Sequence, residues 1–217
     1  MAIAFDTSGS GNAGGGSASF SLAAGAADNV AIILLSYDTG SGATDCSVTV
    51  DGNATTEIGS EFSGTGALAN KRIMMFYYVD PPTTSVTYQA TTTGTGNGIQ
   101  FTAHIYSGVD TTDPVDSTGT GSGTSTTSAT FSTTVVAENC WLASFIQTSA
   151  GGFAASTGTT LRENIAGAGA EGSGDSNGTV GTGSQSMAWT FNSGDYVGRI
   201  LSIQPESATF TPKAIFF

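Results

Sequence analysis

The sequence of 217 residues is short of charge, and above all of positive charge. Only 10% of its residues are charged, with five Lys or Arg against 17 Asp or Glu and a formal net charge of −12. A nucleic-acid partner requires a basic patch, and Lys71 and Arg72 are the only adjacent pair of basic residues. We therefore expect no nucleic-acid partner. The same shortage argues against binding to an anionic membrane surface.

Reactive side chains and long apolar runs are also scarce. The one histidine, His104, lies within a predicted strand between Thr102 and Tyr106 on one face, where the sequence indicates no cleft and no orienting carboxylate. We therefore predict that the chain is not an enzyme. The longest apolar run, Val30 to Leu35, is far below the roughly 18 residues of a membrane span, and the start lacks a signal-peptide pattern. Synthesis in a cytoplasm is the expectation.

Cysteine is limited to Cys46 and Cys140. Two buried thiols in a reducing compartment and a disulfide are both compatible with this pair, and we favour the thiols. A zinc site is not expected, because zinc takes four ligands and one histidine is available.

Strand-forming sequence separated by Gly, Ser and Thr is abundant. Hydrophobic residues make up 38% of the chain, their period is close to two, and turn residues recur about every ten residues. This pattern predicts an all-β fold with almost no helix. Strands are expected at 2–6, 17–22, 29–37, 47–51, 55–59, 72–79, 85–91, 98–107, 126–135, 139–148, 159–164, 185–191 and 196–204. The Gly/Ser/Thr stretches at 7–17, 117–128 and 165–185 are predicted to be surface loops.

Two predicted strands are apolar on both faces, at 30–35 and 73–79. A two-layer sandwich leaves one face of each sheet in water, so these strands need a further cover. Long loops and a neighbouring subunit are the candidates. On this basis Met74, Phe76 and Tyr78 are predicted to be interface residues.

A weak internal echo links the two halves of the chain. Ser17–Ser21 resembles Ser128–Ser132, and Val86–Tyr88 resembles Met187–Trp189, about 100 to 111 residues apart. The echo has two interpretations, a duplicated Greek key or the pseudo-symmetry of one jelly roll. We favour a single domain over 1–205 with the echoing strands in shared sheets, because no linker divides the halves and each has few apolar strands.

The last predicted strand ends before Pro205, which cannot donate to a ladder. Residues 206–217 are predicted to be a docking tail, because a solvated tail has no reason to end in large apolar residues. Its own domain, a neighbouring copy and another protein are all possible docking surfaces. The predicted contact residues are Phe210, Ile215, Phe216 and Phe217.

Two candidate ligand sites remain. The loop of Asp110, Asp113 and Asp116 offers the carboxylates that Ca²⁺ prefers, although Asp and Pro also form ordinary turns. No other cofactor is expected. Exposed aromatic side chains could stack on sugars, and Tyr196 and Phe153 are the best candidates for this role.

The order of several motifs resembles a β-sandwich domain found in phage virion proteins and in some secreted bacterial surface proteins. The matching segments are Ile3–Asp6, Ser47–Gly52, Arg72–Asp80 with Pro81 and Pro82, Tyr106–Asp110, Asp113–Asp116, and Met187–Thr190 leading to Ile203–Pro205. The resemblance covers about 1–205. It implies an antiparallel, two-sheet, jelly-roll-like sandwich with a structural or adhesive role and no catalytic apparatus.

The function expected from these observations is that of a structural component of a phage virion, in capsid decoration or in the tail or fibre. The chain would act through contacts with other virion proteins or with copies of itself, as a homo-oligomer or within a larger assembly. It would be made in the host cytoplasm and reside in the virion. The alternative is an extracellular carbohydrate-binding or adhesive module.

Overall fold

The computed structural model describes residues 1–40, 42–94, 97–166 and 169–207, and these form an antiparallel all-β structure. In chain order the elements are β1 (Ala4–Ala13), β2 (Ser17–Leu22), β3 (Asn29–Asp38), β4 (Asp45–Val50), β5 (Asn53–Ala54), β6 (Thr56–Glu57), β7 (Phe62–Ser63), the 3-10 turn η1 (Gly66–Leu68), β8 (Lys71–Val79), β9 (Val86–Thr93), β10 (Asn97–Ser107), β11 (Val115–Val135), β12 (Trp141–Thr148), β13 (Ala154–Ala155), β14 (Thr160–Ile165), β15 (Glu171–Asp175) and β16 (Gly183–Ile203).

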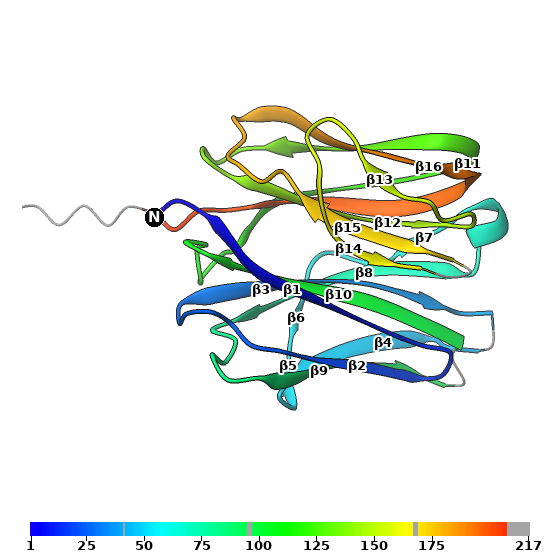
Figure 1. The fold of residues 1–217 in the computed structure, drawn as a ribbon, viewed down its shortest axis with the longest axis horizontal. Helices are drawn as coiled ribbons and strands as arrows, with labels where there is room; N and C mark the ends of the chain where they lie inside the picture. The colour runs from blue at the N-terminus through cyan, green and yellow to red at the C-terminus, as the bar shows by residue number, and fades with distance from the viewer. Residues whose placement is uncertain (41, 95–96, 167–168, 208–217) are drawn as a thin grey trace, which may run out of the picture.

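The strands form three hydrogen-bonded sheets rather than the two predicted. The central sheet has the order β1-β10-β3-β8-β6, with β7 beside β8, and the four-stranded sheet has the order β2-β9-β4-β5. The third sheet has the order β11-β16-β12-β15-β14, with β13 beside β16. The central sheet lies between the other two (Figure 1). The predicted all-β antiparallel sandwich is therefore confirmed, with one additional sheet.

The third sheet, called the folded sheet below, bends back on itself. Its strands β11 and β16 are 21 residues long, and β11 turns at Ser125, which has a φ of 52°. After the turn, the second half of β11 lies over the first half. A Cβ at Gly119 would come within 2.0 Å of the Ser132 carbonyl oxygen, so this close approach requires glycine. The fold consequently has four layers (Figure 1).

The four layers are two copies of one topology. In the first repeat, residues 4–107, one layer has the order β1-β10-β3-β8 and the other contains β2-β9-β4. The second repeat covers residues 115–203. One of its layers has the same order, made by the first half of β11, the second half of β16, β12 and β15. Its other layer contains the second half of β11, the first half of β16 and β13. Of the two interpretations of the sequence echo, the strand order therefore supports a duplication.

A shared feature at the start of each repeat strengthens this equivalence. Asp6 in β1 and Asp116 in β11 both sit at a break in register. The Asp6 carboxylate accepts hydrogen bonds from the Gly25 backbone and the Asn29 side chain, at 2.6 and 3.0 Å. The Asp116 carboxylate accepts from the backbone of Val136 and Ala137, at 2.8 and 3.1 Å. In both repeats the bulged carboxylate holds the turn before the third strand.

The predicted pairing of echoing strands within shared sheets is wrong. Among the described residues, every ladder between named strands joins strands of the same repeat. An isolated bridge between Val109 and Pro205 connects the segments that follow the two repeats. Whether residues 1–205 unfold as one cooperative unit remains a prediction.

The strands that are apolar on both faces are covered by the chain's own sheets. Met74 and Phe76 are 3% and 4% exposed in the core between the central and four-stranded sheets, and Tyr78 packs against that core. Ile73 and Met75 point the other way, toward the folded sheet. The prediction that Met74, Phe76 and Tyr78 contact a neighbour is therefore wrong, because a central sheet needs apolar residues on both faces.

Three further findings bear on the sequence predictions. Cys46 and Cys140 are free and buried in separate cores, as the thiol interpretation predicts. Parts of the predicted loops are strands, because residues 7–13, 117–128 and 171–175 belong to β1, β11 and β15. In the part of the chain that the structure describes, no helix has the length and apolar character needed to cross a membrane.

Candidate functional site

The interior between the two repeats contains a buried polar cluster around His104. His104 Nδ1 lies 3.2 Å from the Tyr106 hydroxyl, and His104 Nε2 lies 2.8 Å from Ser173 Oγ. The Tyr106 hydroxyl donates to Asp175 Oδ2 at 3.1 Å. Arg162 closes the cluster with a bidentate contact to Asp175, at 2.8 and 2.9 Å.

The direction of these hydrogen bonds follows from the carboxylate. Asp175 accepts from Arg162, so the Tyr106 hydroxyl donates its hydrogen to Asp175 and accepts one from His104 Nδ1. His104 Nε2 is then an acceptor, and the Ser173 hydroxyl donates to it. The cluster therefore runs from Ser173 through His104 and Tyr106 to Asp175, all from strand positions of β10 and β15.

Burial sets the protonation of this cluster. Desolvation, together with the charge of the nearby Arg162 guanidinium, lowers the pKa of His104 to about 3. Burial, followed by the charge of Asp175, raises the pKa of the Tyr106 hydroxyl well above its usual range. At neutral pH His104 and Tyr106 are thus both uncharged, and the cluster holds one ion pair, Arg162 with Asp175.

The sequence indicated no carboxylate near His104, but the structure links His104 to Ser173 directly and to Asp175 through the Tyr106 hydroxyl. Ser173 and Asp175 lie in a Gly/Ser stretch that was predicted to be a loop and that forms β15 instead. The serine, histidine and carboxylate are each 0% exposed. A nucleophile needs an accessible oxygen, and here the Ser173 hydroxyl is sealed between two sheets. The cluster in this form can hold the layers together but presents no atom to a substrate.

A second polar cluster lies further along the same strands. Ser36 donates a hydrogen bond to Glu171, and Gln147 Nε2 donates to the Gly169 carbonyl at 3.2 Å. Glu171 is fully buried, and desolvation raises the pKa of its carboxyl well above the ordinary value, opposed by the Ser36 hydrogen bond and the charge of Lys71. Lys71 itself pairs with Asp38 at 3.3 Å, so the Glu171 carboxyl has no cation in direct contact among the described residues.

The predicted calcium site is not formed. Asp110 Oδ1 accepts hydrogen bonds from the backbone of Thr112 and Asp113, at 2.8 and 3.1 Å, which is the geometry of an ordinary Asp turn. Asp116 is directed instead at the backbone of Val136 and Ala137. No group of three or more His, Cys, Asp or Glu side chains within the described ranges could hold a metal ion. The Asp110 and Asp116 carboxylates thus serve separate backbone segments.

The aromatic residues proposed as sugar platforms are packed inside. Phe153 is 8% exposed and lies edge-on to Trp189, with ring centroids 6.4 Å apart. Tyr196 packs against Phe131 and Phe191, at 5.9 and 5.8 Å. All Phe, Trp and Tyr side chains that the structure describes are buried or partly buried. Phe153 is therefore a core residue, and Tyr196 is partly buried against the same core.

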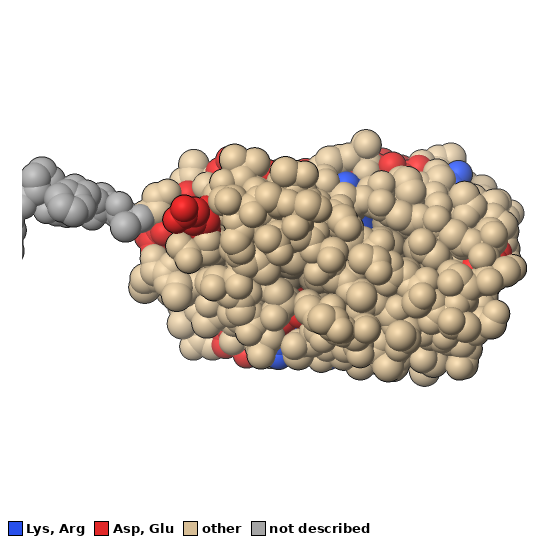
Figure 2. Space-filling model, turned by 90° about the horizontal axis from the view of Figure 1, so that it is seen from above, with Lys and Arg blue, Asp and Glu red and all other residues tan. Residues whose placement is uncertain are grey.

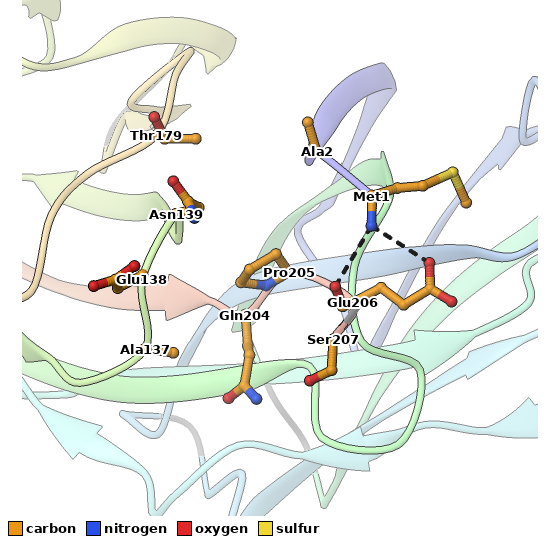
Figure 3. Close-up of a pocket in the computed structure, with 10 residues that line it drawn as sticks. All are labelled: Met1, Ala2, Ala137, Glu138, Asn139, Thr179, Gln204, Pro205, Glu206 and Ser207. Carbon is orange, nitrogen blue, oxygen red and sulfur yellow. Dashed lines mark hydrogen bonds and ion pairs between the residues drawn. The ribbon is translucent and has the colours of Figure 1, made fainter. Parts of the chain in front are cut away.

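A surface hollow lies at one end of the molecule, beside the last described residues. It measures about 490 Å³ and is lined by Met1, Ala2, Ala137, Glu138, Asn139, Thr179, Gln204, Pro205, Glu206 and Ser207 (Figure 3). The Met1 amine contacts the Glu206 carbonyl and carboxylate across its rim, at 3.5 and 3.7 Å. The lining joins the residues before the first repeat to those after the second, together with the β11 to β12 turn and Thr179.

This end is both acidic and locally apolar. Its turns and strand ends carry seven carboxylates, from Asp28, Asp80, Asp110, Asp113, Asp116, Glu138 and Glu206, and Figure 2 shows acidic side chains near the last described residues. Met1 and Val136 are 78% and 73% exposed, the two most exposed large apolar side chains described. We call this surface the acidic end.

The described basic side chains do not offset this charge. Lys71 and Arg72 begin β8 at the opposite end and pair with Asp38 and Glu61. Arg162 binds the buried Asp175, and Arg199 donates to the carbonyl oxygens of Ser60 and Ile58. The predicted tail contacts Phe210, Ile215, Phe216 and Phe217 lie outside the described residues, in the segment that continues from Ser207.

Comparison with known proteins gives no family. No protein-family profile matches the sequence, and no curated protein matches it significantly. Among solved structures, the crystal structure of Cucumber Necrosis Virus is similar over 98% of this chain and 73% of that chain, with 11% sequence identity and a TM-score of 0.29. A TM-score this low supports no inference about function.

Proposed function

We propose that the chain is a non-enzymatic structural component of a phage virion, in capsid decoration or in the tail or fibre, that works by binding other copies of itself or other virion proteins. The observation that carries the proposal is the acidic end. It combines a hollow, the two most exposed large apolar side chains described and a cluster of carboxylates that no described Lys or Arg side chain offsets, and the sequence continues from its rim into 208–217.

The interior chemistry supports a structural role. The one histidine and the most perturbed carboxyl, Glu171, are both fully buried between the repeats. Catalysis requires titratable groups beside a space that a substrate can enter. The polar groups here are directed at one another across the repeat interface, which is the arrangement of a packing element. The order of motifs that resembles phage virion sandwich domains supports the virion as the place of action.

The segment 208–217 has the composition to bind an acidic, partly apolar surface. It contains Phe210, Ile215, Phe216 and Phe217, together with Lys213. Burying one such Phe or Ile side chain contributes about 1.5–3 kcal/mol, which can oppose the cost of ordering a short segment. The lysine complements Glu138 and Glu206, the carboxylates of the hollow. We infer that the segment of one copy binds the acidic end of another.

Sedimentation velocity over a wide range of protein concentration tests this proposal. The full chain should form assemblies, and deletion of 208–217 should abolish them while leaving the melting temperature unchanged. Val136→Ser and Lys213→Glu should each weaken assembly. Leu161→Ser is the matched control, because Leu161 is a 36% exposed apolar residue of β14 that belongs neither to the hollow nor to the β11 to β12 turn that carries Val136.

Two results would contradict the proposal. One is a full chain that stays monomeric at every concentration. The other is an assembly that is insensitive to both Lys213→Glu and the deletion. Electron microscopy of the assembled chain then separates a virion component from aggregation, because regular closed or fibrous particles are expected and amorphous material is not.

A further inference from the structure

The two repeats contact each other through equivalent faces. β10 of the first repeat lies against β14 and β15 of the second, with Tyr106 and His104 bonded to Asp175 and Ser173. The counterpart of β10 is the second half of β16, which lies against β8, the counterpart of β15. Strand β3 faces its own counterpart, β12. This reciprocal arrangement is that of an isologous dimer, here formed within one chain.

Pairing registers show which positions are equivalent. Tyr106 lies between Phe5 and Val30, and Ile203 lies between Val115 and Trp141, so these two residues occupy the same position. By the same comparison His104 corresponds to Leu201. On the facing strands, Tyr77 and Met75 of β8 correspond to Asp175 and Ser173 of β15.

The interface has two flanks, one where β10 faces β14 and β15 and one where β16 faces β8. The side chains at the equivalent positions differ in polarity between the two flanks. On one flank, β10 and β15 are polar and satisfy each other. On the other flank, Leu201 and Ile203 of β16 belong to the same apolar core as Ile73, Met75 and Tyr77 of β8. On this flank the buried Arg199 donates to the carbonyl oxygens of Ser60 and Ile58, and the side chains at the compared positions are apolar except for the Tyr77 hydroxyl. The compared positions are therefore mainly polar on one flank and mainly apolar on the other, although the backbone arrangement is the same.

A repeat paired with a second copy of itself would lose this match. Two first repeats would place His104 against Met75, whose thioether cannot donate the hydrogen bond that Ser173 gives to His104 Nε2. Tyr106 would face Tyr77, whose hydroxyl is a weaker acceptor than the Asp175 carboxylate. Two second repeats would place Asp175 and Ser173 against Ile203 and Leu201. Asp175 would keep Arg162, which belongs to the same repeat, but Ser173 and Asp175 would lose the contacts that His104 and Tyr106 make across the interface. Buried polar groups that lose a hydrogen-bond partner are costly. Such mismatches are a means of rejecting the wrong partner.

We propose that the buried polar side chains of β10, β14 and β15 make each repeat bind the other repeat and reject a second copy of itself. Two further contacts across the same flank belong to this set. Ser8 of β1 donates to Glu163 of β14 at 2.6 Å, and the Arg162 guanidinium lies 3.8 Å from the centre of the Phe5 ring. The function of the Ser173, His104, Tyr106 and Asp175 series is then recognition between repeats.

The test uses the full chain, cut after it has folded. A protease site is inserted between Thr111 and Thr112, which are both exposed in the segment between the repeats. The cleaved protein is mixed with an isotope-labelled sample, and native mass spectrometry identifies which repeats pair. We expect complexes that contain one first and one second repeat, with labelled and unlabelled forms exchanged. Abundant pairs of identical repeats in this unaltered sequence would overturn the proposal.

A variant decides whether the polar cluster is the cause. The double change His104→Leu and Tyr106→Phe makes the β10 position similar to β16, so pairs of two first repeats should rise by about tenfold or more. Tyr106→Phe alone, which removes one hydroxyl, should give a smaller rise. Met75→Ala is the control, because it weakens the apolar flank and should lower association without producing identical pairs. A double variant that still pairs as strictly as the unaltered sequence would refute the assignment.

Discussion

Asp175 is the residue whose loss should disturb the repeat interface most. Its carboxylate is 0% exposed and accepts hydrogen bonds from Arg162, from the Tyr106 hydroxyl and from the Asn177 backbone. Asp175→Ala removes the acceptor for all three. The Arg162 guanidinium then stays near Phe5 without its counter-ion, and the Tyr106 hydroxyl stays buried without a partner.

The expected cost can be worked from these contacts. Removing one partner of a buried ion pair costs about 3–5 kcal/mol, and an unsatisfied buried hydroxyl costs about 1–3 kcal/mol. These costs are not additive, and Arg162 is 16% exposed, so its guanidinium can regain part of its hydration. We therefore expect Asp175→Ala to lower the free energy of unfolding by about 3–4 kcal/mol.

Urea unfolding followed by circular dichroism measures this change. Arg162→Ala and the double variant complete a double-mutant cycle, in which the double variant should be destabilised by clearly less than the sum of the two single variants. The m-value should stay constant if the native state keeps its compactness. A cost below about 1 kcal/mol for Asp175→Ala, or strictly additive costs, would refute the buried network as a stabilising element.

Three other predictions follow from burial. Because the pKa of His104 is lowered to about 3 from 6.5, the unfolded chain binds a proton that the folded chain does not between these values, so stability should fall as pH falls through this window. A pH series of urea unfolding should show a flatter dependence for His104→Gln. The pKa of Glu171 is raised, so stability should fall as pH rises above 4.5, and Glu171→Gln should reduce that loss; an unchanged pH profile would count against it. Phe76→Ala should lower the free energy of unfolding by about 3–5 kcal/mol, measured by thermal or urea unfolding, and should leave assembly unchanged. Altered assembly at unchanged stability would instead indicate that Phe76 contacts a neighbouring subunit.

The strand predictions were most accurate where apolar residues alternate or run together. The predicted strand at 17–22 matches β2, and those at 29–37, 72–79 and 98–107 differ from β3, β8 and β10 by one residue at an end. Strands made of Gly, Ser and Thr were missed, as at 117–123 and 171–175. These segments have little intrinsic preference for a strand, and they are held in the ladder by β16 and β12.

The sequence by itself determined the fold class and the placement of His104 on one strand face with Thr102 and Tyr106, and it favoured two buried thiols over a disulfide. These features depend on local period and residue type. Only the tertiary structure decided the rest. The double-sided strand at 73–79 is central because two sheets of the same chain cover it, and His104 has partners because β15 lies 69 residues away in sequence and adjacent in space. The acidic end likewise gathers carboxylates from separate turns, which no local pattern in the sequence brings together.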